Sequence, residues 1–174
     1  MGRPIADGRG ADKVAGQLAG FSGILQVDGY AAYKALARGH GDAIQLAFCL
    51  AHARRKFVEV YKTTQSPFAH EVIERLQAVY AIEAEIRGLS ASLRLAARHT
   101  RTASLMEALK SRLTAMIGQL FSQSTLTGAI NYALNHWDGL TLFLSDGRVE
   151  VDTNTVERSI RPNCNGAPQL TVPR

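Results

Sequence analysis

The stretch "GILQVDGYAAYKALARGHGDAIQLAFCLAHARRKFVEVYK", residues 23–62, decides the fold class. Two compact apolar runs, residues 23–28 and 43–51, have the composition of buried β-strands. The amphipathic residues 30–38 predict a short helix between them, and residues 52–62 predict a second helix. A strand–helix–strand–helix order indicates a parallel strand pair joined by a crossover, which is a piece of an α/β sheet.

Most of the remaining chain has the apolar periodicity of helices. Apolar residues recur every three to four positions over residues 68–80 and again over 105–120, and Ser66-Pro67 marks the start of the first of these helices. Residues 125–144 predict a third helix with an interruption at Asp138-Gly139. After a turn signal at Ser145-Asp146-Gly147, residues 148–151 predict a brief strand that leads into a last helix ending before Pro162. The sequence therefore predicts a helix-dominated α/β protein.

The composition is that of a soluble globular protein. Of 174 residues, 46% are apolar and 20% are charged. No apolar run is long enough to cross a bilayer, and the first residues lack the apolar segment of a secretory signal. The two cysteines, Cys49 and Cys164, do not suggest a disulfide scaffold. We therefore expect a cytoplasmic protein without a membrane partner.

The positive charge is concentrated in two places. The formal net charge is +5, and residues 87–112 hold six basic residues against one acidic residue. A second basic cluster consists of Arg54, Arg55 and Lys56. The longer stretch is compatible with the solvated face of a helix and with a nucleic-acid-binding surface, and charge alone does not separate them. The shorter cluster follows His52 and is compatible with a helix start that faces phosphate and with a solvated basic turn.

Two carboxylates are candidates for metal ligands. Asp28 ends a predicted strand, where ligand sites of parallel sheets lie, although Gly29 also makes it a plausible turn residue. Glu157 lies in "RVEVDTNTVERSIRP", residues 148–162, where Asn154 and Glu157 have the spacing of a helix capping box. Together Asp28 and Glu157 have the oxygen ligands that Mg²⁺ prefers. Capping and metal binding both remain open for Glu157.

A zinc site is not expected. Cys49 and His52 have the spacing of half a zinc site, but no second close pair follows in the sequence. The sequence also lacks a phosphate-binding P-loop and a nucleophile elbow.

Three motifs in series carry a family resemblance: "GFSGILQVDGYAAYKAL", "CLAHARRKF" and "DGRVEVDTNTVERSIRP". Over about residues 20–162 the chain resembles the insertion-sequence-sixty-six family of bacterial transposases. The resemblance implies part of a ribonuclease H-like catalytic fold interrupted by a large α-helical insertion. It also implies a DDE site, in which three carboxylates hold two Mg²⁺ or Mn²⁺ ions for phosphoryl transfer in DNA transposition.

The resemblance assigns roles to several residues. Asp28 matches the second catalytic Asp and Glu157 the catalytic Glu, and both would ligate metal. Arg158 matches the arginine that is paired with the catalytic Glu. The remaining candidates would support the site or contact DNA, and they are Cys49, His52, Arg54, Arg55, Lys56 and Asn154. The expected organisation is an irregular lead-in (1–20), the first part of the α/β domain (21–65), a helical insertion (66–145), a return carrying the Glu helix (146–162) and a divergent tail (163–174).

Two departures from the family pattern shape the functional expectation. No credible first Asp precedes Asp28, and similarity stops after Pro162, so we expect a truncated reading frame that is inactive alone. Its partners would be transposon-end and target DNA, with a homo-oligomer or a full-length transposase as further partners. The alternative is a non-catalytic DNA-binding or helical interaction protein derived from a transposase.

Overall fold

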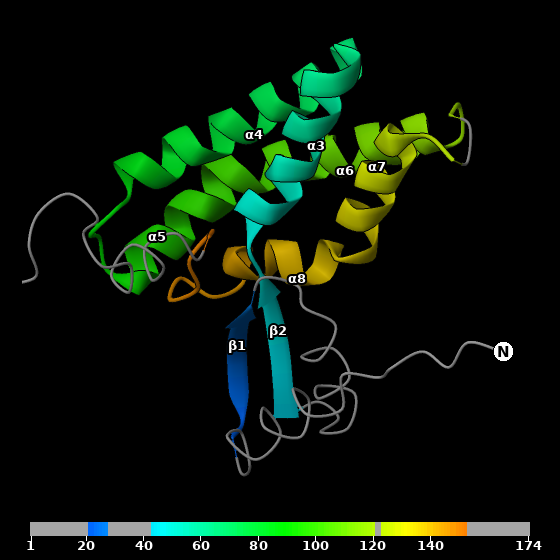
Figure 1. The fold of residues 1–174 in the computed structure, drawn as a ribbon. Coiled ribbons are helices and arrows are strands. Elements are labelled where there is room, and N and C mark those ends of the chain that lie inside the picture. Colours follow the sequence, from blue (N-terminus) through cyan, green and yellow to red (C-terminus); the bar gives the residue numbers. More distant parts are fainter. Residues whose placement is uncertain (1–20, 28–42, 121–122, 153–174) are drawn as a thin grey trace, which may run out of the picture.

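In the computed structural model, helices cover one end of a small sheet (Figure 1). The structure describes residues 21–27, 43–120 and 123–152. Its regular elements are β1 (Gly23–Val27), β2 (Ile44–Phe48), α3 (Leu50–Thr64), α4 (Pro67–Glu85), α5 (Ala91–Ala97), the π-helix η2 (Arg98–Thr102), α6 (Ala103–Ile117), α7 (Thr125–Asn135), α8 (Trp137–Thr141) and the 3₁₀ helix η3 (Leu142–Leu144). The predicted helix-dominated α/β class is confirmed.

The two strands are parallel, as the sequence predicted. Their register runs from Gly23 opposite Ile44 to Val27 opposite Phe48. The predicted crossover helix at 30–38 lies outside the described residues. Parallel pairing places the carboxyl ends of both strands at the same edge, next to the start of α3.

Helices α3 and α4 form a hairpin whose turn is readable in the sequence. Gln65 ends α3 with a left-handed φ of 52°. The Ser66 hydroxyl then accepts a hydrogen bond from the Ala69 backbone N–H at 3.3 Å, and Pro67 is at the first helical position. A serine cap followed by proline is a strong helix-start signal, which explains why this boundary was predictable.

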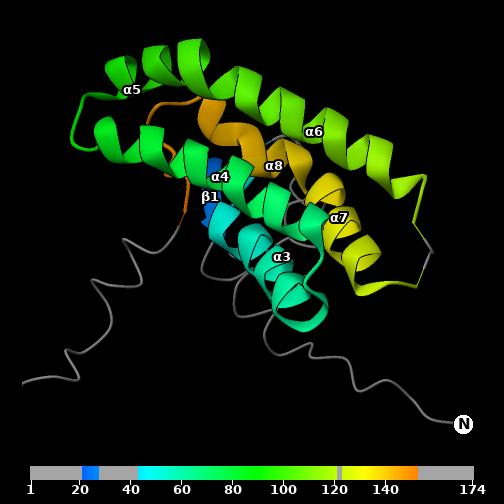
Figure 2. The ribbon, with the colours of Figure 1, turned by 90° about the horizontal axis from the view of Figure 1, so that it is seen from above.

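Helices α5 and α6 continue one another through the π-helix η2, and they run alongside α4 (Figure 2). The Ser90 hydroxyl caps α5 by accepting from the Leu93 N–H at 3.4 Å. A π-helical turn inside an α-helix is rare and is often found at a functional site. Here the first residue of η2 is Arg98, which is completely buried.

The predicted interruption at Asp138-Gly139 is wrong in position. The chain breaks at His136, between α7 and α8, and Gly139 lies inside α8. The glycine at 139 is explained by packing and not by a helix break, because a Cβ added there would lie 2.6 Å from the Leu46 carbonyl oxygen and would overlap the Phe48 ring. The glycine permits close approach of α8 to β2.

The predicted strand at 148–151 is also wrong. Val149 and Val151 are buried, as their alternation suggested, but the segment forms no strand. Instead the Gln26 side chain pairs with the backbone of Glu150. Gln26 Nε2 donates to the Glu150 carbonyl at 2.8 Å, and the Glu150 N–H donates to Gln26 Oε1 at 3.4 Å. A side chain thus takes the place of a neighbouring strand.

One hydrophobic cluster joins the sheet to the helices. It extends from Val27 and Phe48 through the helices to Val149 and Val151. Among the described residues no helix has both the length and the apolar character needed to span a membrane.

Candidate functional site

The chain returns from the helices to the carboxyl edge of the sheet. The Cys49 N–H donates to the Val27 carbonyl at 3.2 Å, and the Leu50 N–H donates to the Val151 carbonyl at 3.0 Å. Two consecutive residues at the start of α3 therefore hold the ends of two segments that are far apart in sequence. Asp28 follows the first segment directly, and Glu157 comes six residues after Val151.

Four of the predicted site residues lie outside the described part of the chain. They are Asp28, Asn154, Glu157 and Arg158. Their roles as ligands, helix cap and ion-pair partner therefore stay predictions. What the structure adds is the position of the segments that lead into them.

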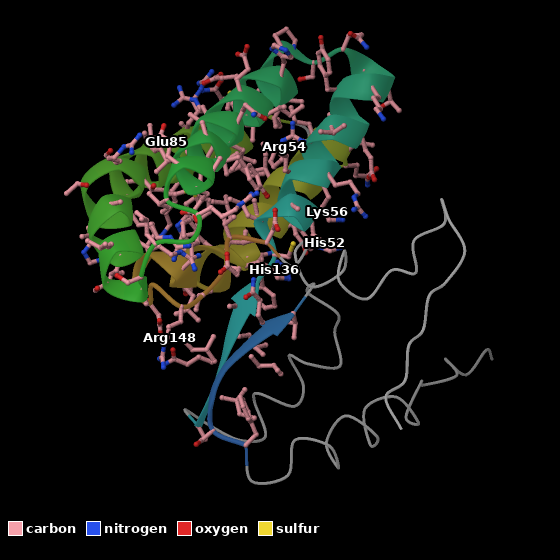
Figure 3. The ribbon with its side chains drawn as sticks, turned by 90° about the vertical axis from the view of Figure 1, so that its left-hand side faces the viewer. His52, Arg54, Lys56, Glu85, His136 and Arg148 are labelled. Carbon is pink, nitrogen blue, oxygen red and sulfur yellow. The ribbon has the colours of Figure 1, made fainter. Side chains whose placement is uncertain are left out.

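Cys49 and His52 lie at the convergence point. Cys49 is the residue before α3 and is 1% exposed. His52 is half-buried in the first turn, and its Nδ1 atom is buried without a hydrogen-bond partner among the residues described. Figure 3 shows His52 near the carboxyl end of β2, where His136 packs edge-on against Phe48 with ring centroids 4.9 Å apart.

No cluster of three or more His, Cys, Asp or Glu side chains that could hold a metal occurs within the described ranges. The expectation that no zinc is bound stays a prediction. The oxygen ligands proposed for Mg²⁺ or Mn²⁺ belong to residues outside these ranges.

The basic cluster after His52 is divided between two sides of α3. Lys56 Nζ lies over the Tyr132 ring of α7, 4.5 Å from the centroid. Arg54 instead lies between α3 and α4 (Figure 3), and with Arg55 it lines a pocket there. Residues two apart on a helix point in different directions, so a run of basic letters does not make one surface.

This pocket has a volume of about 490 Å³. Burial raises the pKa of Tyr80 above its usual range, and the neighbouring Asp152 carboxylate raises it further. The pocket is lined by Ala51, Arg54, Arg55 and Val58 of α3, Gln77 and Tyr80 of α4, Arg87 beyond α4, and Asp152.

Arg98 is neither a solvated residue nor a surface for nucleic acid. Its guanidinium is 0% exposed and binds both oxygens of Glu83, with Nε–Oε1 at 2.8 Å and Nη2–Oε2 at 2.7 Å. Arg98 Nη1 also donates to the carbonyls of Phe143 at 3.0 Å and Val149 at 2.9 Å. Arg98 thus connects α4, η3 and the returning segment.

Other arginines of the 87–112 stretch are also paired internally. Arg94 donates to both carboxylate oxygens of Glu150, at 2.7 and 2.9 Å, and holds the same returning segment. Much of the positive charge that suggested a DNA-binding helix is therefore neutralised within the fold. The further pairs are Arg101 with Glu85 at 2.6 Å and Arg112 with Glu71 at 2.9 Å.

Sequence reasoning missed the roles of Glu83, Glu150, Tyr80 and Arg87. Glu83 gave the clearest missed signal, because it lies on the buried face of α4 between Val79 and Ile86. A carboxylate at an apolar position of a periodic helix indicates a buried partner.

The family model described as "Transposase IS66 family" matches residues 4–166. Three curated proteins of Sinorhizobium fredii (strain NBRC 101917 / NGR234) are similar. The uncharacterized protein y4jD is 52% identical over 165 residues, covering 92% of this chain and 32% of the relative. The uncharacterized protein y4qI is 44% identical, covering 90% of this chain and 30% of the relative. The uncharacterized protein y4hP is 38% identical, covering 83% of this chain and 29% of the relative. This chain thus spans about a third of each relative. No solved structure matches it.

Proposed function

Because the chain belongs to the transposase IS66 family, we propose that it forms part of the catalytic region of a DDE transposase. Residues 21–65 and 146–162 would contribute to a ribonuclease H-like domain, and residues 66–145 would be a helical insertion within it. The reaction would be metal-dependent phosphoryl transfer on transposon-end and target DNA. A homo-oligomer or a full-length transposase would be its protein partner.

The observation that best supports this proposal is the convergence at the start of α3. Val27 and Val151 accept hydrogen bonds from the adjacent residues Cys49 and Leu50. The segments that continue to Asp28 and toward Glu157 therefore begin side by side. Without this arrangement, a site shared by two carboxylates 129 residues apart in sequence would have no structural support.

Asp28 and Glu157 would hold Mg²⁺ or Mn²⁺, since carboxylate oxygens suit these hard cations. When bound, two such ions supply stabilisation of the attacking and leaving oxygens during phosphoryl transfer. The chain's own residues would position these groups. Asn154 would cap the helix that presents Glu157, and Arg158 would contact a phosphate or pair with an acid.

Metal binding by the purified chain tests the two carboxylates directly. We expect Asp28→Asn and Glu157→Gln each to weaken Mn²⁺ binding roughly tenfold or more, because each removes a charged ligand. Binding can be followed by the enhancement of water-proton relaxation by Mn²⁺. Glu107→Gln, which removes an exposed carboxylate of α6, is the matched control. Equal binding by all three variants would refute the assignment.

The chain alone is expected not to nick supercoiled plasmid DNA with either Mg²⁺ or Mn²⁺. Its motifs match two of the three family carboxylates, and two-metal catalysis needs the complete ligand set. The assay is the conversion of supercoiled to relaxed plasmid on a gel. Cleavage that disappears in Glu157→Gln would contradict the expected inactivity while supporting the assigned Glu.

A further inference from the structure

The arginines of the described residues divide into two groups. Six lie within ion-pair distance of a carboxylate: Arg75, Arg94, Arg98, Arg101, Arg112 and Arg148. The other three, Arg54, Arg55 and Arg87, have no such partner among the residues the structure describes. All three line the 490 Å³ pocket between α3 and α4.

The three guanidinium groups come from two elements that fold against each other. Arg54 and Arg55 lie in the first turns of α3, whereas Arg87 follows the end of α4. Arg54 is half-buried, and its Nε atom is buried without a hydrogen-bond partner in the described part of the chain. A buried guanidinium donor without an acceptor is costly, so a group that accepts hydrogen bonds would be favoured next to Arg54.

The charge of the lining identifies the class of ligand. The lining contains three arginines and a single carboxylate, that of Asp152. Gln77 and Tyr80 add neutral polar groups. Several arginines that line one cavity can donate to the tetrahedral oxygens of a phosphate. We propose that this pocket binds a phosphate group of a DNA strand, with Arg54, Arg55 and Arg87 as its ligands.

Asp152 relates the pocket to the proposed catalytic site. Its carboxylate repels a phosphate and so confines that group to the arginine side of the pocket. Asp152 follows Val151 at the convergence point and precedes Glu157 by five residues. A strand whose phosphate occupies the pocket would therefore pass close to Asp152, from which the chain continues toward Glu157. Assigning the phosphate to DNA rests on the proposed function, whereas the pocket's affinity for anions does not.

The test is DNA binding by variants that remove one positive charge each. Arg55→Gln and Arg87→Gln alter exposed residues on different elements, so the fold should persist. Each should weaken binding of a fluorescent oligonucleotide roughly tenfold and lower the slope of log Kd against log salt by about 1. If both side chains hold the same phosphate, the double variant should lose less than the sum of the single losses.

Arg101→Gln is the matched control, because it removes the same charge from an exposed arginine that pairs with Glu85 instead. Comparing oligonucleotides with and without a 5′-phosphate distinguishes a terminal phosphate from an internal phosphodiester, and inorganic phosphate should compete in either case. The proposal is wrong if the pocket variants bind DNA like Arg101→Gln. Unchanged DNA binding in Glu157→Gln would show that the pocket acts independently of the metal site, so the two proposals can fail separately.

Discussion

Replacing Arg98 by methionine is expected to lower the free energy of unfolding by about 3–5 kcal/mol. The substitution keeps an unbranched side chain of similar length but leaves the Glu83 carboxylate buried, at 8% exposure, without its bidentate partner. It also removes the donor that binds the carbonyls of Phe143 and Val149. The measurement is urea unfolding followed by circular dichroism.

Two further variants show whether burial causes this loss. Arg101→Met breaks the pair with Glu85, whose side chains are 45% and 58% exposed, and should cost no more than about 1 kcal/mol. In Arg98→Met the Glu83 carboxylate keeps, among the described residues, only Arg94, whose Nη2 lies 4.0 Å from Oε2. Adding Glu83→Met removes this poorly paired buried charge and should recover part of the stability. Recovery should be incomplete, because the two carbonyls still lack their donor. Equal effects of Arg98→Met and Arg101→Met would show that the buried pair has no special role.

The position of this network links stability to the proposed site. Arg98 and Arg94 both bind the segment that ends at Val151, through the Val149 carbonyl and the Glu150 carboxylate. This segment continues toward Glu157. The helical part of the chain therefore does more than pack against itself, since its arginines fix the position at which the chain re-enters the sheet edge.

Local sequence patterns were sufficient to predict most of the helices and strands. The parallel pair, α3 and the start of α4 follow from apolar periodicity, a serine cap and a proline, all of which act within a few residues. The Arg98–Glu83 pair depends on two helices meeting, and neither residue identifies the other in the sequence. The basic stretch was therefore open to two surface interpretations, and the buried role of Arg98 fits neither.

In the returning segment, residues 148–151, the apolar alternation correctly predicts burial but wrongly predicts a strand. The alternation of Val149 and Val151 correctly places both side chains in the core. It cannot specify a backbone partner, and here that partner is the side chain of Gln26. For the proposed site, the sequence motifs identify Asp28 and Glu157 as candidates. The structure shows that Val27 and Val151, from which the chain continues toward these two residues, bind adjacent residues at the start of α3.

Gly139 gives the second large expected effect, and it reverses an ordinary rule about glycine. Gly139→Ala should destabilise the protein by about 3 kcal/mol, because the new methyl group would overlap the Leu46 carbonyl of β2 and the Phe48 ring. The Phe48 ring can move, but the carbonyl belongs to the strand backbone. Relief therefore requires α8 to move away from β2, which would open the core. Thermal and urea unfolding measure the loss.

Gly128, in α7, is the matched control, since nothing lies within 4 Å of a Cβ added there. Gly128→Ala should stabilise the protein by up to about 1 kcal/mol, because alanine is the better helix former. The structure places both glycines inside helices, and helix propensity alone predicts a gain in stability at each. Opposite signs would establish that Gly139 is required by the contact between α8 and β2. A gain at both positions would mean that this contact is looser than the structure indicates, and that glycine at 139 only weakens its helix.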